Sequence, residues 1–175
     1  MSLSEPTFEE AVAQLRDEQS ILSKEMFSLF SDILPRQLRL FLESWDSVST
    51  ARQQEFVSHL KREHEIDTLL CFDVLAQALL HADDALVRAS AIRLLSEYER
   101  SDVIPVFLEI AQNDPATEPR AEAITMLGGF ILRGELDEIS KERLYNVEDI
   151  LLALVNSTEK AELRQRALES LGYSS

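Results

Sequence analysis

The sequence predicts an all-α fold, a solenoid (α-α superhelix) of antiparallel helix pairs with an N-terminal helical cap. The main observation is an internal repeat, in which residues 87–96, 119–128 and 163–172 superpose position by position. Each copy opens with an apolar residue or Pro followed by Arg, and then carries Ala, a branched apolar residue and Leu. Such self-similarity is typical of stacked helical arrays, because one unit cannot bury its apolar face alone. A content of 45% hydrophobic residues with only four Gly and five Pro also favours helices over a sheet.

Residues 1–66 predict the N-terminal helical cap together with a degenerate repeat. Thr7 and Glu10 have the spacing of a capping box, so the first helix is expected to begin at Thr7. A second helix is expected over residues 23–34, where Pro35 interrupts the helical pattern.

Two further helices are expected before residue 67. The third follows Pro35 and is expected to bury a stripe of Leu38, Phe41, Leu42 and Trp45. The fourth starts near Thr50, where Thr50 and Gln53 offer another capping box. These helices only faintly echo the repeat, which is common in the terminal units of arrays.

Residues 67–175 predict the repeat array itself, with units at 67–100, 101–134 and 135–172. Asp67 and Ser140 are expected to cap helix starts, and Gly134 to end a helix. The expected helix pairs are 68–81 with 85–99, 103–113 with 118–132, and 141–156 with 160–171.

The chain carries a net charge of −15, from 32 acidic and 17 basic residues spread along its length. Binding to nucleic acid or to an anionic membrane is disfavoured, because neutralising phosphates requires clustered Lys and Arg. Two interpretations of the acidic charge remain. It forms a solvated surface that aids solubility, or it attracts a basic protein partner to an acidic groove.

The single cysteine and the chain start indicate a reducing compartment. Cys71 has no second cysteine to pair with, and it is expected to be a small buried hydrophobe in a helix rather than a nucleophile. The first residues lack the basic start and apolar stretch of a signal peptide, and no apolar run is long enough to cross a bilayer. A cytoplasmic location is therefore expected.

The repeat resembles a HEAT repeat, of the short type found in phycobilin-lyase-related proteins. The resemblance rests on an Asp-containing turn followed by Arg at the start of the second helix, in residues 83–91 and in 114–115 with 119–123. Residues 161–167 keep the Arg but lack the turn Asp. The resemblance covers residues 67–172 and implies a right-handed, HEAT-like α-α superhelix. It says little about function, because this repeat serves many unrelated roles.

The repeated Arg positions are interpreted as structural. Arg88, Arg120 and Arg164 are each expected to bond a turn carboxylate or carbonyl, with Asp84 and Asp114 as the obvious partners. Ligand binding is the alternative. Small residues also recur at Ser96, Gly128 and Gly172, where they are expected to permit close helix approach or to end the helix.

No catalytic, metal or cofactor site is predicted. His59 and Glu63 are one helical turn apart, but a metal site needs further ligands, and a solvated surface pair is the expected outcome. Deoxyhypusine hydroxylase resembles this architecture but carries His-Glu pairs at its second helices. The only such pair in this sequence is His64-Glu65, outside the array.

A binding surface remains as the expected functional feature. The second helices are expected to present short and mixed-charge residues at positions 89, 93 and 97 and at their equivalents in the later repeats. Plain solvated surface is the alternative interpretation of this strip. The candidate partner-binding residues are Arg93, Glu97, Thr125, Gln165, Glu169 and Tyr173.

The predicted function is a non-catalytic scaffold or adaptor that binds a protein partner through its concave face or an exposed array end. An assembly or maturation subunit, lyase-like and acting on a chromophore- or cofactor-bearing protein, is the alternative, and a stand-alone enzyme is a third. Leu168 and Leu171 are expected near an uncovered array end. The array is then incomplete, self-associating or covered by a partner.

Overall fold

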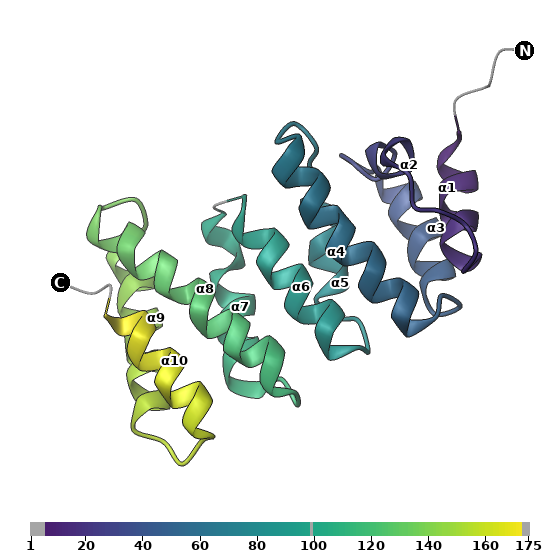
Figure 1. The fold of residues 1–175 in the computed structure, drawn as a ribbon. Coiled ribbons are helices and arrows are strands. Elements are labelled where there is room, and N and C mark those ends of the chain that lie inside the picture. Colours follow the sequence, from purple (N-terminus) through teal and green to yellow (C-terminus); the bar gives the residue numbers. More distant parts are fainter. Residues whose placement is uncertain (1–5, 99, 173–175) are drawn as a thin grey trace, which may run out of the picture. The chain divides into compact units, whose positions relative to one another are not determined.

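The computed structural model of the chain describes residues 6–98 and 100–172. All the regular structure in these residues is helical, and no strand occurs among them, which confirms the all-α prediction (Figure 1). The chain divides into two compact units, Met1–Leu94 and Leu95–Ser175. The division falls inside α6 (Ala85–Ser96), and each unit is described separately.

The first unit begins with a helix whose start was correctly predicted. The Thr7 hydroxyl accepts a hydrogen bond from the backbone N–H of Glu10, and the Glu10 carboxylate accepts one from that of Thr7 at 2.7 Å. This reciprocal pair is the capping box. The helices of the unit before α6 are α1 (Phe8–Arg16), α2 (Lys24–Ser28), α3 (Pro35–Trp45), α4 (Thr50–Ile66) and α5 (Asp73–Leu79).

An aromatic cluster forms the core of the first unit. The ring of Phe56, on α4, lies 5.0 Å from that of Phe30, 5.6 Å from that of Phe27 and 5.8 Å from that of Phe41. Edge-to-face and offset contacts at these separations are the favoured aromatic geometries. Phe56 therefore ties α3 to the segment that carries α2, and it buries its own ring completely.

The second helix is much shorter than predicted. Instead of residues 23–34, α2 spans only Lys24–Ser28. Asp32 takes a left-handed backbone conformation, with φ of 49°, and its N–H donates to the carbonyl oxygen of Cys71 at 2.8 Å. The Ser31 hydroxyl accepts from the Cys71 N–H. The chain leaves the helical path because a distant segment supplies these hydrogen bonds.

Two other helix starts in the first unit also differ from expectation. Ser49 caps α4 in place of Thr50, and the Gln53 carboxamide donates to the carbonyl oxygen of Trp45 instead of completing a capping box. Asp67 ends α4 rather than starting the next helix, and its carboxylate accepts from the N–H of Leu69. Helix α5 consequently starts at Asp73, not 68.

The second unit is a two-layer stack of helix pairs. After a 3₁₀ turn (Ser101–Val103), its helices are α7 (Ile104–Asn113), α8 (Thr117–Glu135), α9 (Lys141–Val155) and α10 (Ala161–Leu171). Helix α7 packs on α8 and α9 on α10, while α8 also lies beside α10 and α7 beside α9 (Figure 1). Ser140 caps α9 as predicted.

The two glycines predicted to shape α8 behave differently from one another. Gly128 permits a close approach to α10, because a Cβ atom there would lie 3.0 Å from the Cβ of Ser170. The buried Ser170 hydroxyl donates to the carbonyl oxygen of Ile124 at 2.9 Å, which fixes the same contact. Gly134, expected to end the helix, lies inside it. The helix continues to Glu135, and Gly134 is buried against the Leu144 side chain.

The repeated arginines close the turns within helix pairs. The Arg88 guanidinium donates to the carbonyl oxygens of Ala82 and Asp83, both at 2.8 Å. Arg120 donates to Ala111 at 2.9 Å and Arg164 to Val155 at 3.1 Å, in each case nine residues back at the end of the preceding helix. These carbonyls have no partner in their own helix, so the arginines supply one.

The turn carboxylates and Glu159 complete this arrangement. Asp84 accepts from the N–H of Val87 at 3.0 Å and from the Gln54 carboxamide, and Asp114 accepts from the N–H of Ala116 at 2.8 Å. The Arg120 guanidinium also forms an ion pair with Glu159, at 2.9 Å. This hydrogen-bonded pair lowers the pKa of Glu159.

Arg52 has the same role in the first unit, although sequence reasoning did not identify it. It sits in the first turn of α4, it is buried, and its guanidinium donates to the carbonyl oxygens of Gln14, Asp17 and Ser20. The recognisable signal was an Arg in the first turn of a helix, ahead of a buried apolar stripe.

Replacing Gly128 by Val should destabilise the second unit. The new side chain must enter the contact between α8 and Ser170, and overpacking of this kind costs about 1–3 kcal/mol. Gly129→Val is the matched control, since a Cβ at Gly129 meets no atom within 4 Å. Urea denaturation of both variants measures the difference, and equal stabilities would contradict the close approach.

Truncating Arg120 should cost more stability than truncating Arg164. Arg120→Ala removes hydrogen bonds from a largely buried guanidinium and should lower the free energy of unfolding by about 2–3 kcal/mol. Arg164 is exposed, so Arg164→Ala should cost less than about 1 kcal/mol. Chemical denaturation tests the order, and a larger loss in Arg164→Ala would refute it.

The pair of Arg120 and Glu159 should give the stability a component that depends on pH. Because the folded-state pKa of Glu159 lies below its ordinary value of 4.5, the pair stabilises the fold above that pH and loses its effect as pH falls through the lowered pKa. Glu159→Gln should therefore be less stable than wild type at neutral pH, and the gap should close in acid. Urea unfolding curves of both proteins at neutral and at acidic pH measure this difference in the free energy of unfolding. A difference that does not change with pH would contradict the prediction.

Candidate functional site

The predicted binding strip is only partly exposed on α6. Arg93 and Glu97 are exposed, as expected for a surface strip. Ala89, expected beside them, is fully buried, and so is Ile92. Only a narrow stripe of α6 is exposed, because the helix buries most of its circumference. Ala121, the equivalent of Ala89 on α8, is also buried.

The equivalent positions of the later repeats lie on α8 and α10 of the second unit. Thr125 is half-buried, and its hydroxyl donates to the carbonyl oxygen of Ala121. Gln165 and Glu169 are exposed one helical turn apart, and the carboxamide donates to the carboxylate at 2.9 Å. Tyr173, the last predicted member, lies outside the described residues.

A hollow of about 480 Å³ lies against the exposed side of α8 and includes Thr125. Phe130 and Met126 contribute apolar walls, and Gly129 leaves the side of the helix open. The Arg133 guanidinium lies over the Phe130 ring at 5.6 Å and pairs with Glu138. The full lining is Ser96, Thr125, Met126, Gly129, Phe130, Leu132 and Arg133.

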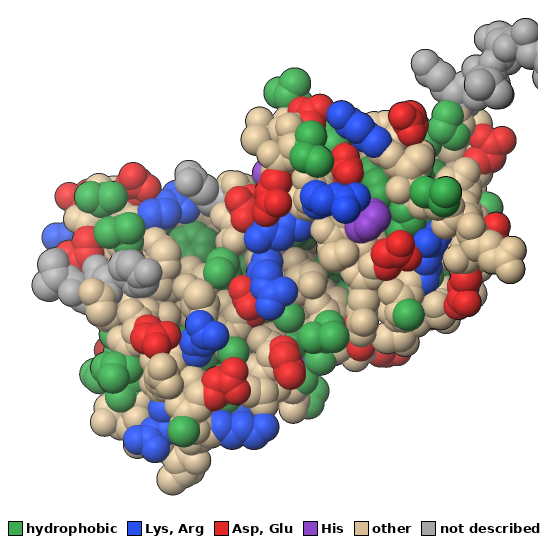
Figure 2. Space-filling view, viewed as in Figure 1, with side chains coloured by type: hydrophobic (Ala, Val, Ile, Leu, Met, Phe, Trp, Pro, Cys, Tyr) green, Lys and Arg blue, Asp and Glu red, His purple; other side chains and the backbone are tan. Residues whose placement is uncertain are grey.

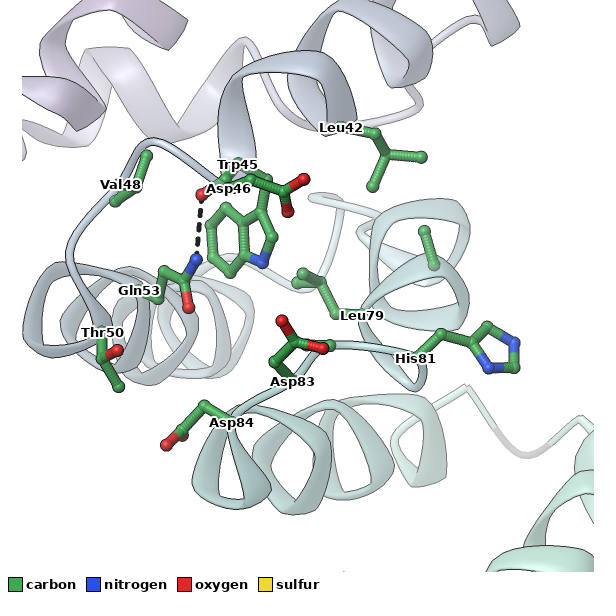
Figure 3. Close-up of a pocket in the computed structure, with 12 residues that line it drawn as sticks. Leu42, Trp45, Asp46, Val48, Thr50, Gln53, Leu79, His81, Asp83 and Asp84 are labelled. Atoms are coloured by element: carbon green, nitrogen blue, oxygen red, sulfur yellow. Dashed lines mark hydrogen bonds between the residues drawn. The ribbon is translucent and has the colours of Figure 1, made fainter.

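A second cavity, of about 550 Å³, lies in the first unit and was not predicted (Figure 3). The end of α3 and the start of α4 form one side of it, and the end of α5 with the turn 81–84 forms the other. The hydrogen bond from Gln53 to the Trp45 carbonyl oxygen, at 2.9 Å, holds α3 and α4 together at its edge. The lining is Leu42, Trp45, Asp46, Val48, Thr50, Gln53, Ala78, Leu79, His81, Ala82, Asp83 and Asp84.

Three aspartates give this cavity an acidic rim. Asp46 and Asp83 are exposed, whereas Asp84 is half-buried and caps α6. None of the twelve lining residues is Lys or Arg. The neighbouring Arg88 is buried behind the turn, where it donates to carbonyl oxygens of the turn backbone. We refer to this cavity, defined by its twelve lining residues, as the acidic pocket.

The residues considered for metal binding or nucleophilic chemistry do not form a site. Glu63 is buried and His59 is half-buried against the Phe27 ring, so the expected solvated pair is wrong. Burial lowers the pKa of His59. Within residues 6–98 and 100–172, no group of three or more His, Cys, Asp or Glu side chains has the arrangement to hold a metal ion.

Cys71 differs from expectation in its local structure. It lies half-buried in the extended segment before α5 rather than in a helix, and its thiol contacts the Asp73 carboxylate at 3.4 Å. Burial raises the pKa of the thiol, which keeps it protonated and weakly nucleophilic.

Charged side chains of both signs lie on the face drawn in Figure 2. In this view Lys and Arg side chains stand among Asp and Glu side chains. Phosphate backbones are bound by clustered cations, and the net charge of −15 disfavours such binding. In a separate observation, none of the described helices has the length and apolar character to span a bilayer.

Sequence reasoning missed the acidic pocket because its lining comes from segments that are far apart in the chain. Trp45 and Leu42 were assigned together to the buried stripe of α3. Trp45 is buried, but Leu42 is 39% exposed and lines the cavity. The consecutive Asp83 and Asp84 were interpreted only as turn residues.

Comparison with known proteins identifies the repeat. A family model described as HEAT repeats matches residues 72–172, which is more than half of the chain. No curated protein matches the chain, and no solved structure matches it. The matched segment contains the repeated arginines Arg88, Arg120 and Arg164 and all of α7 to α10. The chain belongs to the HEAT-repeat family.

Proposed function

We propose that this protein is a non-catalytic scaffold that binds a protein partner through the face of α8 and α10 in the second unit. HEAT repeats generally mediate protein–protein interaction, and this general role supports the proposal. The partner-binding residues we assign to this face are Thr125, Gln165 and Glu169. Glu97, just after α6, is a further candidate in the same unit, and Arg93, on α6, is a separate candidate in the first unit.

The single observation that carries the proposal is the hollow against α8. Protein interfaces obtain most of their affinity from a few apolar or aromatic anchors that enter pockets, surrounded by a polar rim. Met126 and Phe130 offer an apolar wall of this kind, and Arg133 lies beside them. The polar pair of Gln165 and Glu169 on the adjacent α10 is suited to a rim.

The composition supports a basic partner. A net charge of −15 accelerates the association of positively charged proteins and slows that of acidic ones. The electrostatic contribution is long-ranged, so it selects the class of partner, whereas the hollow decides where the partner docks.

Filling the hollow should abolish partner binding. Gly129→Arg places a long, charged side chain where a Cβ meets no atom within 4 Å, so the variant should fold while it blocks the hollow. Affinity capture from cells of the native host, followed by mass spectrometry, should recover the partner with wild type. Recovery should fall at least about tenfold with Gly129→Arg, as when a central anchor is lost.

The controls separate occlusion from a change of charge. Gly129→Ala keeps the hollow open and should bind like wild type. Glu109→Arg introduces an arginine at an exposed position of α7, in the other layer of the same unit, and should also retain the partner. Full recovery of the partner with Gly129→Arg would show that the docking face lies elsewhere.

A further inference from the structure

The lining of the acidic pocket in the first unit includes a hydrogen-bond donor, the indole N–H of Trp45. Trp45 is 5% exposed, and among the described residues the structure gives its indole N–H no hydrogen-bond acceptor. The indole forms part of the pocket wall, with its nitrogen turned toward the interior (Figure 3). The indole nitrogen is accessible from the pocket, so it can donate a hydrogen bond to an acceptor oxygen of a ligand.

The aspartates that line the pocket favour a positive charge on the same ligand. Asp46, Asp83 and Asp84 line the pocket, and none of its lining residues is Lys or Arg. The Asp84 carboxylate is turned away from Trp45 (Figure 3) and accepts from the Val87 N–H and the Gln54 carboxamide. Arg88 cannot neutralise the rim by moving into it without breaking its hydrogen bonds to the carbonyls of Ala82 and Asp83. The pocket therefore attracts cations and repels carboxylates and phosphates.

The cation that fits is organic rather than metallic. The described residues, which include all three aspartates, contain no group of three or more His, Cys, Asp or Glu side chains arranged to hold a metal ion. A cavity of about 550 Å³ accommodates a side chain together with the backbone that carries it. The apolar walls, Leu42 and Leu79 among them, suit the methylene stem of a long side chain.

We propose that the acidic pocket binds an arginine or lysine side chain on an extended segment of a protein partner. The cationic group contacts the carboxylates of Asp46 and Asp83, and a backbone carbonyl oxygen of the segment accepts the hydrogen bond from the Trp45 indole. A planar guanidinium also bonds a carboxylate through two parallel N–H groups, so arginine binds more tightly than lysine. This inference rests on the proposed scaffold role and names a chemical feature of the partner.

The chain provides its own reporter for this pocket, since Trp45 is its only tryptophan. The indole N–H signal in a ¹H–¹⁵N spectrum of the full chain is therefore unique. The probe is a blocked five-residue peptide of glycine and serine with a central arginine, and the comparison peptides carry lysine, citrulline or glutamate in its place. The arginine peptide should shift the indole signal most and the lysine peptide less, while citrulline and glutamate peptides should leave it unmoved.

Neutralising the rim should weaken this binding without unfolding the protein. Asp46 and Asp83 are exposed, and Asp46→Asn with Asp83→Asn should raise the dissociation constant of the arginine peptide about tenfold. The matched control, Glu109→Gln with Asp149→Asn, removes the same charge from exposed positions of the second unit and should leave the constant unchanged. Unchanged peptide affinity in the rim variant would overturn the proposal.

The remaining outcomes are also decisive. Guanidinium ion carries the charge without a carbonyl, so it should bind more weakly than the blocked peptide. If guanidinium ion bound as tightly as the arginine peptide, the hydrogen bond from Trp45 would be refuted. If the citrulline peptide bound as tightly as the arginine peptide, recognition of the positive charge would be refuted. Because the assay uses a synthetic peptide, it is independent of the capture experiment with Gly129→Arg. Failure of one therefore does not imply failure of the other.

Discussion

An arginine in the first turn of a helix, donating to backbone carbonyl oxygens of an earlier segment, is the interaction on which this structure depends. It occurs at Arg52, Arg88, Arg120 and Arg164. A helix end exposes carbonyls that its own ladder cannot satisfy, and a turn between antiparallel helices brings them close to the next helix start. A guanidinium has enough donors to satisfy several of them at once. The same kind of hydrogen bond, from an arginine to a backbone carbonyl, thus recurs at each of these helix starts.

The same interaction has consequences for the acidic pocket. Arg88 draws the carbonyl groups of Ala82 and Asp83 toward the interior of the turn. Asp84 is fixed at the start of α6 through the N–H of Val87, and Asp83 remains exposed at the rim. The Arg88 guanidinium bonds backbone carbonyls of the turn, and the ligand binding that we propose uses the neighbouring Asp83.

The helices that could be predicted are those whose signals are local. The capping box at Thr7 and the cap at Ser140 are set by neighbouring residues, and both occur as expected. The failures have long-range causes. The Asp32 N–H donates to the Cys71 carbonyl oxygen, so α2 is shorter and α5 starts later in the chain than predicted. Gly134 lies inside α8 because it packs against the Leu144 side chain. A sequence pattern contains no information about these partners, because they come from other helices.

The candidate sites also divide into features set by local sequence and features set by contacts between distant segments. Arg93, Gln165 and Glu169 are exposed because one stripe of a helix can be assigned from its period alone. The acidic pocket combines an indole from α3 with carboxylates from the turn before α6, and only folding brings them together. Trp45 appears in the sequence as an ordinary core residue, and its burial agrees with that interpretation. What distinguishes it is a single N–H without an acceptor, and that is a property of the folded surroundings rather than of the residue.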